Sequence, residues 1–114
     1  MMKSPVKTNV LFICSRNQWR SPTAENIWKN SNFYNVRSAG TSPKARKQVS
    51  STDVDWADII LVMETKHKHR LMAEFTQMLT HKPIYVLDIP DEYQFMDAEL
   101  ILELKEKVQY LLPS

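Results

Sequence analysis

Three short runs of consecutive apolar residues stand out in an otherwise mixed chain, at residues 10–13, 59–63 and 84–87. Their apolar residues do not alternate with polar ones, a pattern typical of strands that are buried on both faces of a parallel sheet. A weaker run at residues 34–38 predicts a fourth strand. The sequence therefore predicts a four-stranded sheet with little solvent on either face.

Helical periodicity separates these runs. One apolar face follows Ser21-Pro22 and contains Ala24, Ile27 and Trp28. Two further helical patterns consist of Leu71, Met72, Phe75, Met78 and Leu79, and of Leu100, Ile101, Leu104, Val108 and Leu111. A short helix is expected at residues 53–58. Residues 41–52 are polar and basic, which predicts a surface connection.

The alternation of strands and helices predicts an α/β fold, a small three-layer domain with a four-stranded parallel sheet flanked by helices. A chain of 114 residues has the size of one domain, so we expect residues 1–114 to form a single unit. Ligands of such sheets bind outside the carboxyl ends of the strands. The residues of interest therefore follow Ile13, Ser38, Met63 and Leu87.

The composition of the chain argues against several classes of protein, among them nucleic-acid-binding and membrane proteins. The balance of 15 Lys and Arg against 13 Asp and Glu gives a net charge of +2, too small to indicate nucleic-acid binding. No stretch approaches the ~20 apolar residues of a membrane span, and the apolar stretch near the start is too short for a signal peptide. We therefore expect a cytoplasmic protein with no membrane contact. The single glycine excludes Gly-rich nucleotide loops, and the single cysteine excludes an internal disulfide and a multi-cysteine metal site.

The single cysteine lies at the end of the first predicted strand. The sequence there is CSRNQWRSP, so Arg20 follows Cys14 by six residues and Ser21-Pro22 opens a helix, with Ser21 as the predicted N-cap. A loop that runs from a strand into a helix N-terminus directs backbone N–H groups and the positive end of the helix dipole at its centre. Arg20 adds a planar fork for two phosphate oxygens, and the same field favours a Cys14 thiolate. The loop therefore predicts a phosphoryl-transfer site.

Cysteine is also a frequent core residue, and a Cys-x5-Arg spacing alone is a weak signal. However, the stretch VLFICSRNQWRSPTAE resembles the phosphate-binding loop and first helix of the low-molecular-weight protein tyrosine phosphatase family. The resemblance continues at residues 36–41, 45–49 and 56–63 and extends to about His69. It implies a fold with this loop after the first strand.

The resemblance also implies a phosphatase that hydrolyses phosphate monoesters, above all phosphotyrosine, through a phosphocysteine intermediate. Cys14 would attack phosphorus, Arg20 and the loop amides would bind the phosphate oxygens, and Ser21 would stabilise the Cys14 thiolate. The phosphate-binding residues implied are Ser15, Arg16, Asn17, Gln18, Trp19 and Ser21. The implied partner is a phosphotyrosine-containing protein or a small aryl phosphate, and no cofactor or metal is required.

Two loop positions depart from the family pattern. Arg16 stands where the family commonly has glycine, and Trp19 where it commonly has a second cysteine. Arg16 either adds a cation at the mouth of the pocket or points away from it. Trp19 either forms a wall of the pocket or packs against the first helix. Gly40, after the second strand, is expected to adopt a positive φ.

The general acid of the family is an aspartate in an Asp-Pro-Tyr segment after the fourth strand. Residues 87–93 read LDIPDEY and offer two candidates. Asp88 directly follows the predicted strand and is the preferred one, while Asp91 precedes Tyr93 by two residues. Tyr93 is expected to form an aromatic wall beside the substrate ring. Either aspartate could also be a turn residue.

Two clusters of charged or titratable residues are expected to be structural, and two functions other than phosphatase remain alternatives. His67-Lys68-His69 is expected to be a solvated helix face, and Asp53, Asp55 and Asp58 to be helix-start carboxylates. An arsenate reductase shares this type of loop, and with one cysteine it would need an external thiol. A non-catalytic module that binds phosphate or phosphopeptides is the other alternative.

Overall fold

The computed structural model describes residues 6–112. Residues 1–5 and 113–114 lie outside this range, and so does part of the segment for which no signal peptide is expected. The strands are β1 (Thr8–Cys14), β2 (Tyr34–Gly40), β3 (Ile59–Val62) and β4 (Ile84–Val86). The helices are α1 (Arg20–Trp28), α2 (Ser51–Trp56), α3 (Thr65–Glu74) and α4 (Ala98–Leu111). The four predicted strands and the alternating order of elements are confirmed.

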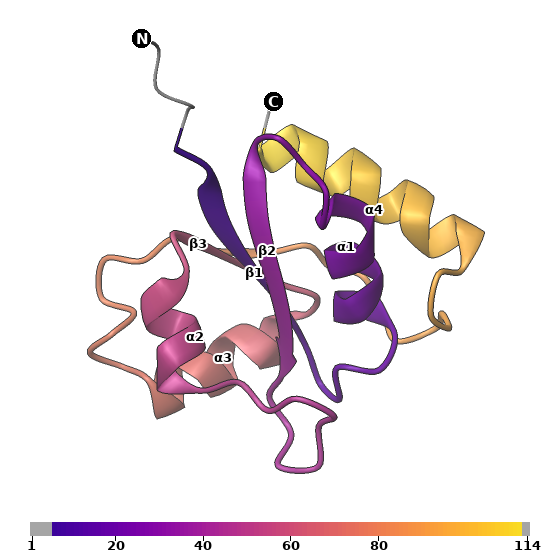
Figure 1. The fold of residues 1–114 in the computed structure, drawn as a ribbon. Helices are drawn as coiled ribbons and strands as arrows, with labels where there is room; N and C mark the ends of the chain where they lie inside the picture. The colour runs from indigo at the N-terminus through magenta and orange to yellow at the C-terminus, as the bar shows by residue number, and fades with distance from the viewer. Residues whose placement is uncertain (1–5, 113–114) are drawn as a thin grey trace, which may run out of the picture.

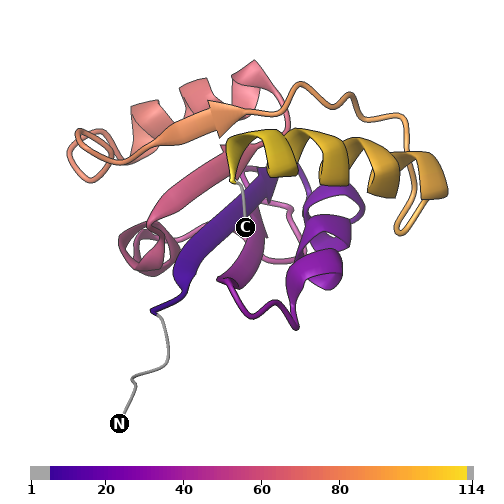
Figure 2. The ribbon, with the colours of Figure 1, turned by 90° about the horizontal axis from the view of Figure 1, so that it is seen from above.

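The four strands form one parallel sheet in the order β2-β1-β3-β4 (Figure 1). Helices α1 and α4 cover one face of this sheet and α2 and α3 cover the other, which gives the predicted three layers (Figure 2). After β1 the chain first runs to β2 on one side and then returns to β3 on the other side. Such a reversal opens a crevice at the carboxyl end of the central strand, and that end is Cys14.

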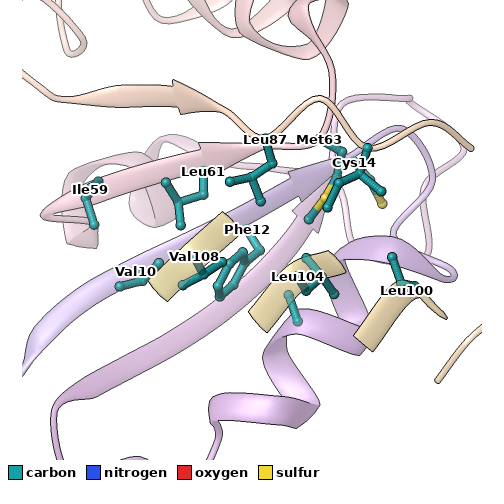
Figure 3. Close-up of a cluster of buried hydrophobic side chains, with 12 residues drawn as sticks. Val10, Phe12, Cys14, Ile59, Leu61, Met63, Leu87, Leu100, Leu104 and Val108 are labelled. Carbon is teal, nitrogen blue, oxygen red and sulfur yellow. The ribbon is translucent and has the colours of Figure 1, made fainter. Parts of the chain in front are cut away.

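Each face of the sheet has its own hydrophobic core because the strand residues alternate between the two faces. Val10 and Phe12 pack with Leu104 and Val108 of α4 on one face, and Leu11 and Ile13 pack on the other. Cys14 belongs to the first core and lies with Met63 and Leu87 at the carboxyl ends of three strands (Figure 3). The core therefore anchors the base of the crevice.

Helix α1 begins two residues earlier than the sequence predicts, at Arg20 rather than at Pro22. The position before Arg20, Trp19, makes no capping hydrogen bond with its side chain. The prediction that Ser21 is the N-cap is wrong, because its hydroxyl is instead 3.0 Å from the sulfur of Cys14. The first turn of the helix is thus organised around the cysteine.

Helix α3 is displaced from its predicted position. The apolar pattern from Leu71 to Leu79 predicts a helix there, but α3 ends at Glu74. The Phe75 N–H closes the helix on the carbonyl of Leu71, and Leu79 enters the core from the turns that follow. Leu71 and Leu79 are therefore buried without a longer helix, whereas Met72 and Met78 of the same apolar pattern are exposed.

Residues 41–52 are only partly the surface connection that the composition predicts. Thr41 and Val49 are buried, and Ser50 caps α2, where its hydroxyl and the Asp53 carboxylate form a reciprocal capping box. Backbone N–H groups of this segment bind the loop after β1: Thr41 donates to the Cys14 carbonyl (3.0 Å) and Ser42 to the Ser15 carbonyl (2.9 Å). The segment is a brace for that loop. No helix among residues 6–112 is long and apolar enough to cross a membrane.

Candidate active site

The sulfur of Cys14 is buried at the base of the loop between β1 and α1 and faces two donors. The backbone N–H of Asn17 donates to Sγ at 3.3 Å, and the hydroxyl of Ser21 lies 3.0 Å from it. A thiolate can only accept, so the Ser21 hydroxyl donates once the sulfur is ionised. Both contacts stabilise a negative charge on sulfur, which is what a nucleophilic cysteine requires.

Asn17 holds the loop in shape. It is fully buried with a φ of 54°, in the left-handed region that asparagine tolerates better than most residues. Its side-chain amide donates to the hydroxyls of Ser21 and Ser38, both at 2.9 Å, and its two carbonyl oxygens accept from Arg46. Asn17 does not line the cavity described below. Its side chain fixes the loop conformation rather than facing a ligand.

Gly40 makes room for this loop. The prediction of a positive φ is wrong, since no glycine of the chain has one. A Cβ at this position would lie 2.5 Å from the Ser15 carbonyl oxygen and 2.7 Å from the Cβ of Ala45. Glycine is therefore required by the close approach of two backbones, not by the dihedral angle.

A cavity of about 210 Å³ opens above the sulfur. Its walls come from the loop and from the segment after β4: Cys14, Ser15, Arg16, Gln18, Trp19, Arg20 and Asp91. Arg16 is exposed at this cavity, so the first of its two alternatives holds and it adds a cation at the mouth. Trp19 is 41% exposed and lines the cavity, which makes it an aromatic wall.

Arg20 is the buried cation of the site. Its side chain is 2% exposed, and Nη1 donates to Oε1 of Glu64 (2.5 Å) and to the carbonyl of Ile89 (2.8 Å). Burial raises the pKa of Glu64, but the hydrogen bond and charge of Arg20 outweigh it and lower the pKa below its ordinary value. Glu64 is thus an ionised partner that fixes the guanidinium. The sequence analysis missed its role, although the position directly after Met63 was among those of interest.

His67 connects α3 to the same loop. The ring is buried, Nδ1 accepts from the Glu64 backbone N–H (3.0 Å), and Nε2 lies 2.8 Å from the Ser15 hydroxyl. Because Nδ1 accepts, Nε2 carries the proton and donates to Ser15. Burial, followed by the nearby Arg20 charge, lowers the pKa of His67 to about 4. The expected solvated face at this position is wrong: His67 is a neutral support of the loop.

The structure separates the two candidate acids. Oδ1 of Asp91 lies 3.7 Å from Nε of Arg20, and the half-exposed Asp91 side chain lines the Cys14 cavity. Asp88 has a φ of 58°, its carbonyl accepts from Lys107, and its side chain lines a different cavity beside α4. The prediction that Asp88 faces the loop is therefore wrong. Asp88 adopts a left-handed conformation, and Asp91, three residues later, shares the cavity with Cys14.

In comparisons with known proteins, the chain matches solved structures only. No family model and no curated protein matches the chain. Among solved structures, the low-molecular-weight protein tyrosine phosphatase SP-PTP of Streptococcus pyogenes superposes with a TM-score of 0.72 at 22% identity, covering 94% of this chain and 95% of that one. The tyrosine phosphatase Wzb of Escherichia coli K30, in complex with phosphate, gives 0.74 at 18% identity, with 93% and 96% covered. The chain has the fold of the low-molecular-weight protein tyrosine phosphatases.

A third structure of the same fold carries a different activity in its name. The arginine phosphatase YwlE of Geobacillus stearothermophilus gives a TM-score of 0.68 at 22% identity, covering 88% of this chain and 85% of that one. Structures with this phosphatase fold therefore include proteins named for two phosphorylated side chains.

Tyr93 does not have the place that the resemblance to these phosphatases implies. It is absent from the cavity above Cys14, packs against the core beside α4, and donates its hydroxyl to Glu103 at 3.0 Å. That hydrogen bond is the main cause that raises the pKa of Tyr93. In this structure Tyr93 lies away from the cavity, and the aromatic side chain that lines it is Trp19.

Replacement of Gly40 by alanine is expected to disturb the loop. The added Cβ collides with backbone, so Gly40→Ala should cost about 1–3 kcal/mol of stability and lower vanadate affinity about tenfold or more. Denaturant unfolding and vanadate titration measure the two effects. Asn35→Ala, at the other end of β2, is the control and should change vanadate affinity little. Unaltered vanadate binding by Gly40→Ala would contradict the close approach.

The buried His67 gives the protein a specific pH dependence. An unfolded histidine has a pKa of ~6.5, so between pH 6.5 and 4 the unfolded state binds a proton that the folded state does not. Stability should fall as the pH is lowered from 7 to 5, with this group contributing up to about 1.4 kcal/mol per pH unit. His67→Gln should flatten that fall. His69→Gln, on the exposed side of α3, should keep it, and equal profiles for all three proteins would contradict the assignment.

Proposed function

We propose that this protein is a cysteine-dependent phosphatase that hydrolyses phosphate monoesters, with phosphotyrosine in proteins as its substrate class. The observation that carries the proposal is a single cavity in which three groups converge. These are the Cys14 sulfur with its two donors, the fixed guanidinium of Arg20 and the carboxyl group of Asp91. A nucleophile, an oxyanion clamp and a proton donor are the parts that phosphoryl transfer needs.

The first chemical step forms a bond between Sγ of Cys14 and phosphorus and breaks the bond from phosphorus to the ester oxygen. Arg20 has Nη1 occupied by Glu64 and Ile89, which leaves the Nη2 side of the fork to the phosphate oxygens. Asp91 donates its proton to the leaving oxygen. The product alcohol departs and phosphocysteine remains, with charge balanced by Arg20 and the loop amides.

The second step uses the same groups in reverse. The Asp91 carboxylate takes a proton from a water molecule as its oxygen attacks phosphorus, and the P–S bond breaks. Inorganic phosphate leaves, and the Cys14 thiolate is restored against the Asn17 N–H and the Ser21 hydroxyl. No electrons are transferred, so hydrolysis needs no external thiol.

Trp19 and the free thiol support the finer parts of the proposal. An aromatic wall beside the phosphate cradle favours an aryl ester, and thus phosphotyrosine, over an alkyl one. A nucleophile that must stay reduced fits the cytoplasm. Because one protein of this fold is named an arginine phosphatase, phosphoarginine belongs among the substrates tested. Arsenate reduction would require an external thiol, since Cys14 is the only cysteine.

Hydrolysis of p-nitrophenyl phosphate and of a phosphotyrosine peptide tests the proposal directly. Cys14→Ser should abolish both reactions while vanadate still binds, because the cradle survives the change. Glutathione-dependent arsenate reduction is measured in parallel. A wild-type protein that binds vanadate and hydrolyses neither ester would support the binding-module alternative, and turnover by Cys14→Ser would exclude the phosphocysteine route.

The general acid is tested by the acidity of the leaving group. Tyrosine, with a pKa of ~10, leaves poorly without a proton, whereas nitrophenol leaves more readily as an anion. Asp91→Asn should therefore slow phosphotyrosine hydrolysis about 10²-fold or more and p-nitrophenyl phosphate hydrolysis much less. Asp88→Asn is the matched control and should affect both substrates little and equally. A selective loss in Asp88→Asn alone would assign the acid to Asp88.

A further inference from the structure

A second cavity, of about 260 Å³, adjoins the same loop and shares Ser15 with the cavity above Cys14. Its polar walls come from the loop after β1, the loop after β2 and the first two turns of α3: Ser15, Thr41, Ser42, Lys66, His67 and Arg70. Ser15 lines both cavities, and its hydroxyl is held by His67. The two cavities therefore meet at Ser15.

The charges of this second cavity have one sign. Lys66 and Arg70 are four residues apart on α3 and so lie on the same helix face. No carboxylate lines the cavity. Arg70 makes no hydrogen bond or ion pair with residues 6–112, and the nearest carboxylate oxygen to the Lys66 ammonium, at 4.0 Å, belongs to Glu64, which is already bound to Arg20. The cavity thus presents the charge of Arg70, which no carboxylate of residues 6–112 pairs, and that of Lys66, whose ion pair with Glu64 is long.

The hydroxyl of a largely buried threonine gives a second, independent indication of a ligand. Thr41 is 7% exposed, and its hydroxyl has no hydrogen-bond partner in the described part of the chain. Because no fully enclosed side-chain oxygen in residues 6–112 lacks a partner, the small exposed part of Thr41 includes its hydroxyl, and the space it reaches is the cavity that it lines. The Thr41 hydroxyl is therefore available to an acceptor in this cavity.

We propose that the second cavity is an anion subsite for an acidic group on the same substrate. The group is a carboxylate or a second phosphate that lies two or three residues from the phosphotyrosine. An extended peptide advances about 3.3 Å per residue, so a spacing of two or three residues suits a substrate that occupies two cavities sharing Ser15. The inference rests on the proposed phosphatase function and assigns that function a preference for acidic phosphopeptides.

Matched phosphotyrosine peptides test the subsite. One set carries glutamate or phosphoserine two or three residues from the phosphotyrosine on either side, and the other carries glutamine or serine there. In the wild-type protein at low salt, kcat/KM should be about tenfold higher for the acidic peptide on the preferred side, and the ratio should shrink as salt is added. A ratio of one would overturn the inference while hydrolysis of both peptides leaves the phosphatase function standing. Hydrolysis of neither peptide would count against the function itself.

Charge variants on α3 locate the effect. In Lys66→Gln/Arg70→Gln the acidic-to-neutral ratio should fall to about one, and Arg70→Glu should reverse the preference. Thr41→Val should reduce the ratio about two- to fivefold. Lys68→Gln changes the same charge on the same helix outside the cavity and should keep the wild-type ratio. An acidic preference that survives Lys66→Gln/Arg70→Gln would place its origin elsewhere and overturn the proposal.

A free anion in solution, rather than an acidic group on the peptide, could also bind in the second cavity. Sulfate is therefore added to the neutral peptide at constant ionic strength, with wild type beside Lys66→Gln/Arg70→Gln. Inhibition that is equal in the two proteins reflects sulfate at the catalytic loop and is consistent with the proposal. A change in kcat that occurs only in the wild-type protein would show a site for free anions and would overturn the assignment to the substrate.

Discussion

The buried guanidinium of Arg20 is the interaction on which the site depends. A charge withdrawn from water must be matched by partners that arrive from elsewhere in the chain. Glu64 follows β3, while Ile89 and Asp91 follow β4. Since β1, β3 and β4 are successive strands of the sheet, pairing this one cation draws their three carboxyl ends together. The cradle for phosphate and the placement of the acid are thus set by the same charge.

The support of the loop is distributed over distant segments rather than contained within it. His67 holds Ser15 from α3, Arg46 holds Asn17 from the segment after β2, and Gly40 leaves space for both backbones. These contacts come from three separate segments, so the loop conformation is held by the protein itself and does not depend on a ligand. Preorganised donors of this kind need no rearrangement when charge develops on phosphorus.

The apolar runs and the position of Cys14 and Arg20 could be predicted because they depend on local patterns. The role of Glu64 could not, since its partner is 44 residues away and a lone glutamate after a strand resembles any surface carboxylate. His67 sits in a run that is otherwise polar, and only the tertiary fold buries it. The error between Asp88 and Asp91 concerns the backbone after β4, which ends at Val86: Asp88 adopts a left-handed conformation, and Asp91 shares the cavity with Cys14.

The loop also has a consequence for redox chemistry. Trp19 stands at the loop position where the family commonly has a second cysteine. The 114 residues contain no other thiol that could form a disulfide with an oxidised Cys14. A sulfenic acid formed on Cys14 by peroxide therefore has no internal partner for a disulfide, and further peroxide carries it to the irreversible sulfinic state. Recovery depends on how quickly an outside thiol reaches a sulfur at the bottom of a 210 Å³ cavity. The irreversibly oxidised fraction should therefore accumulate with both the peroxide concentration and the duration of exposure.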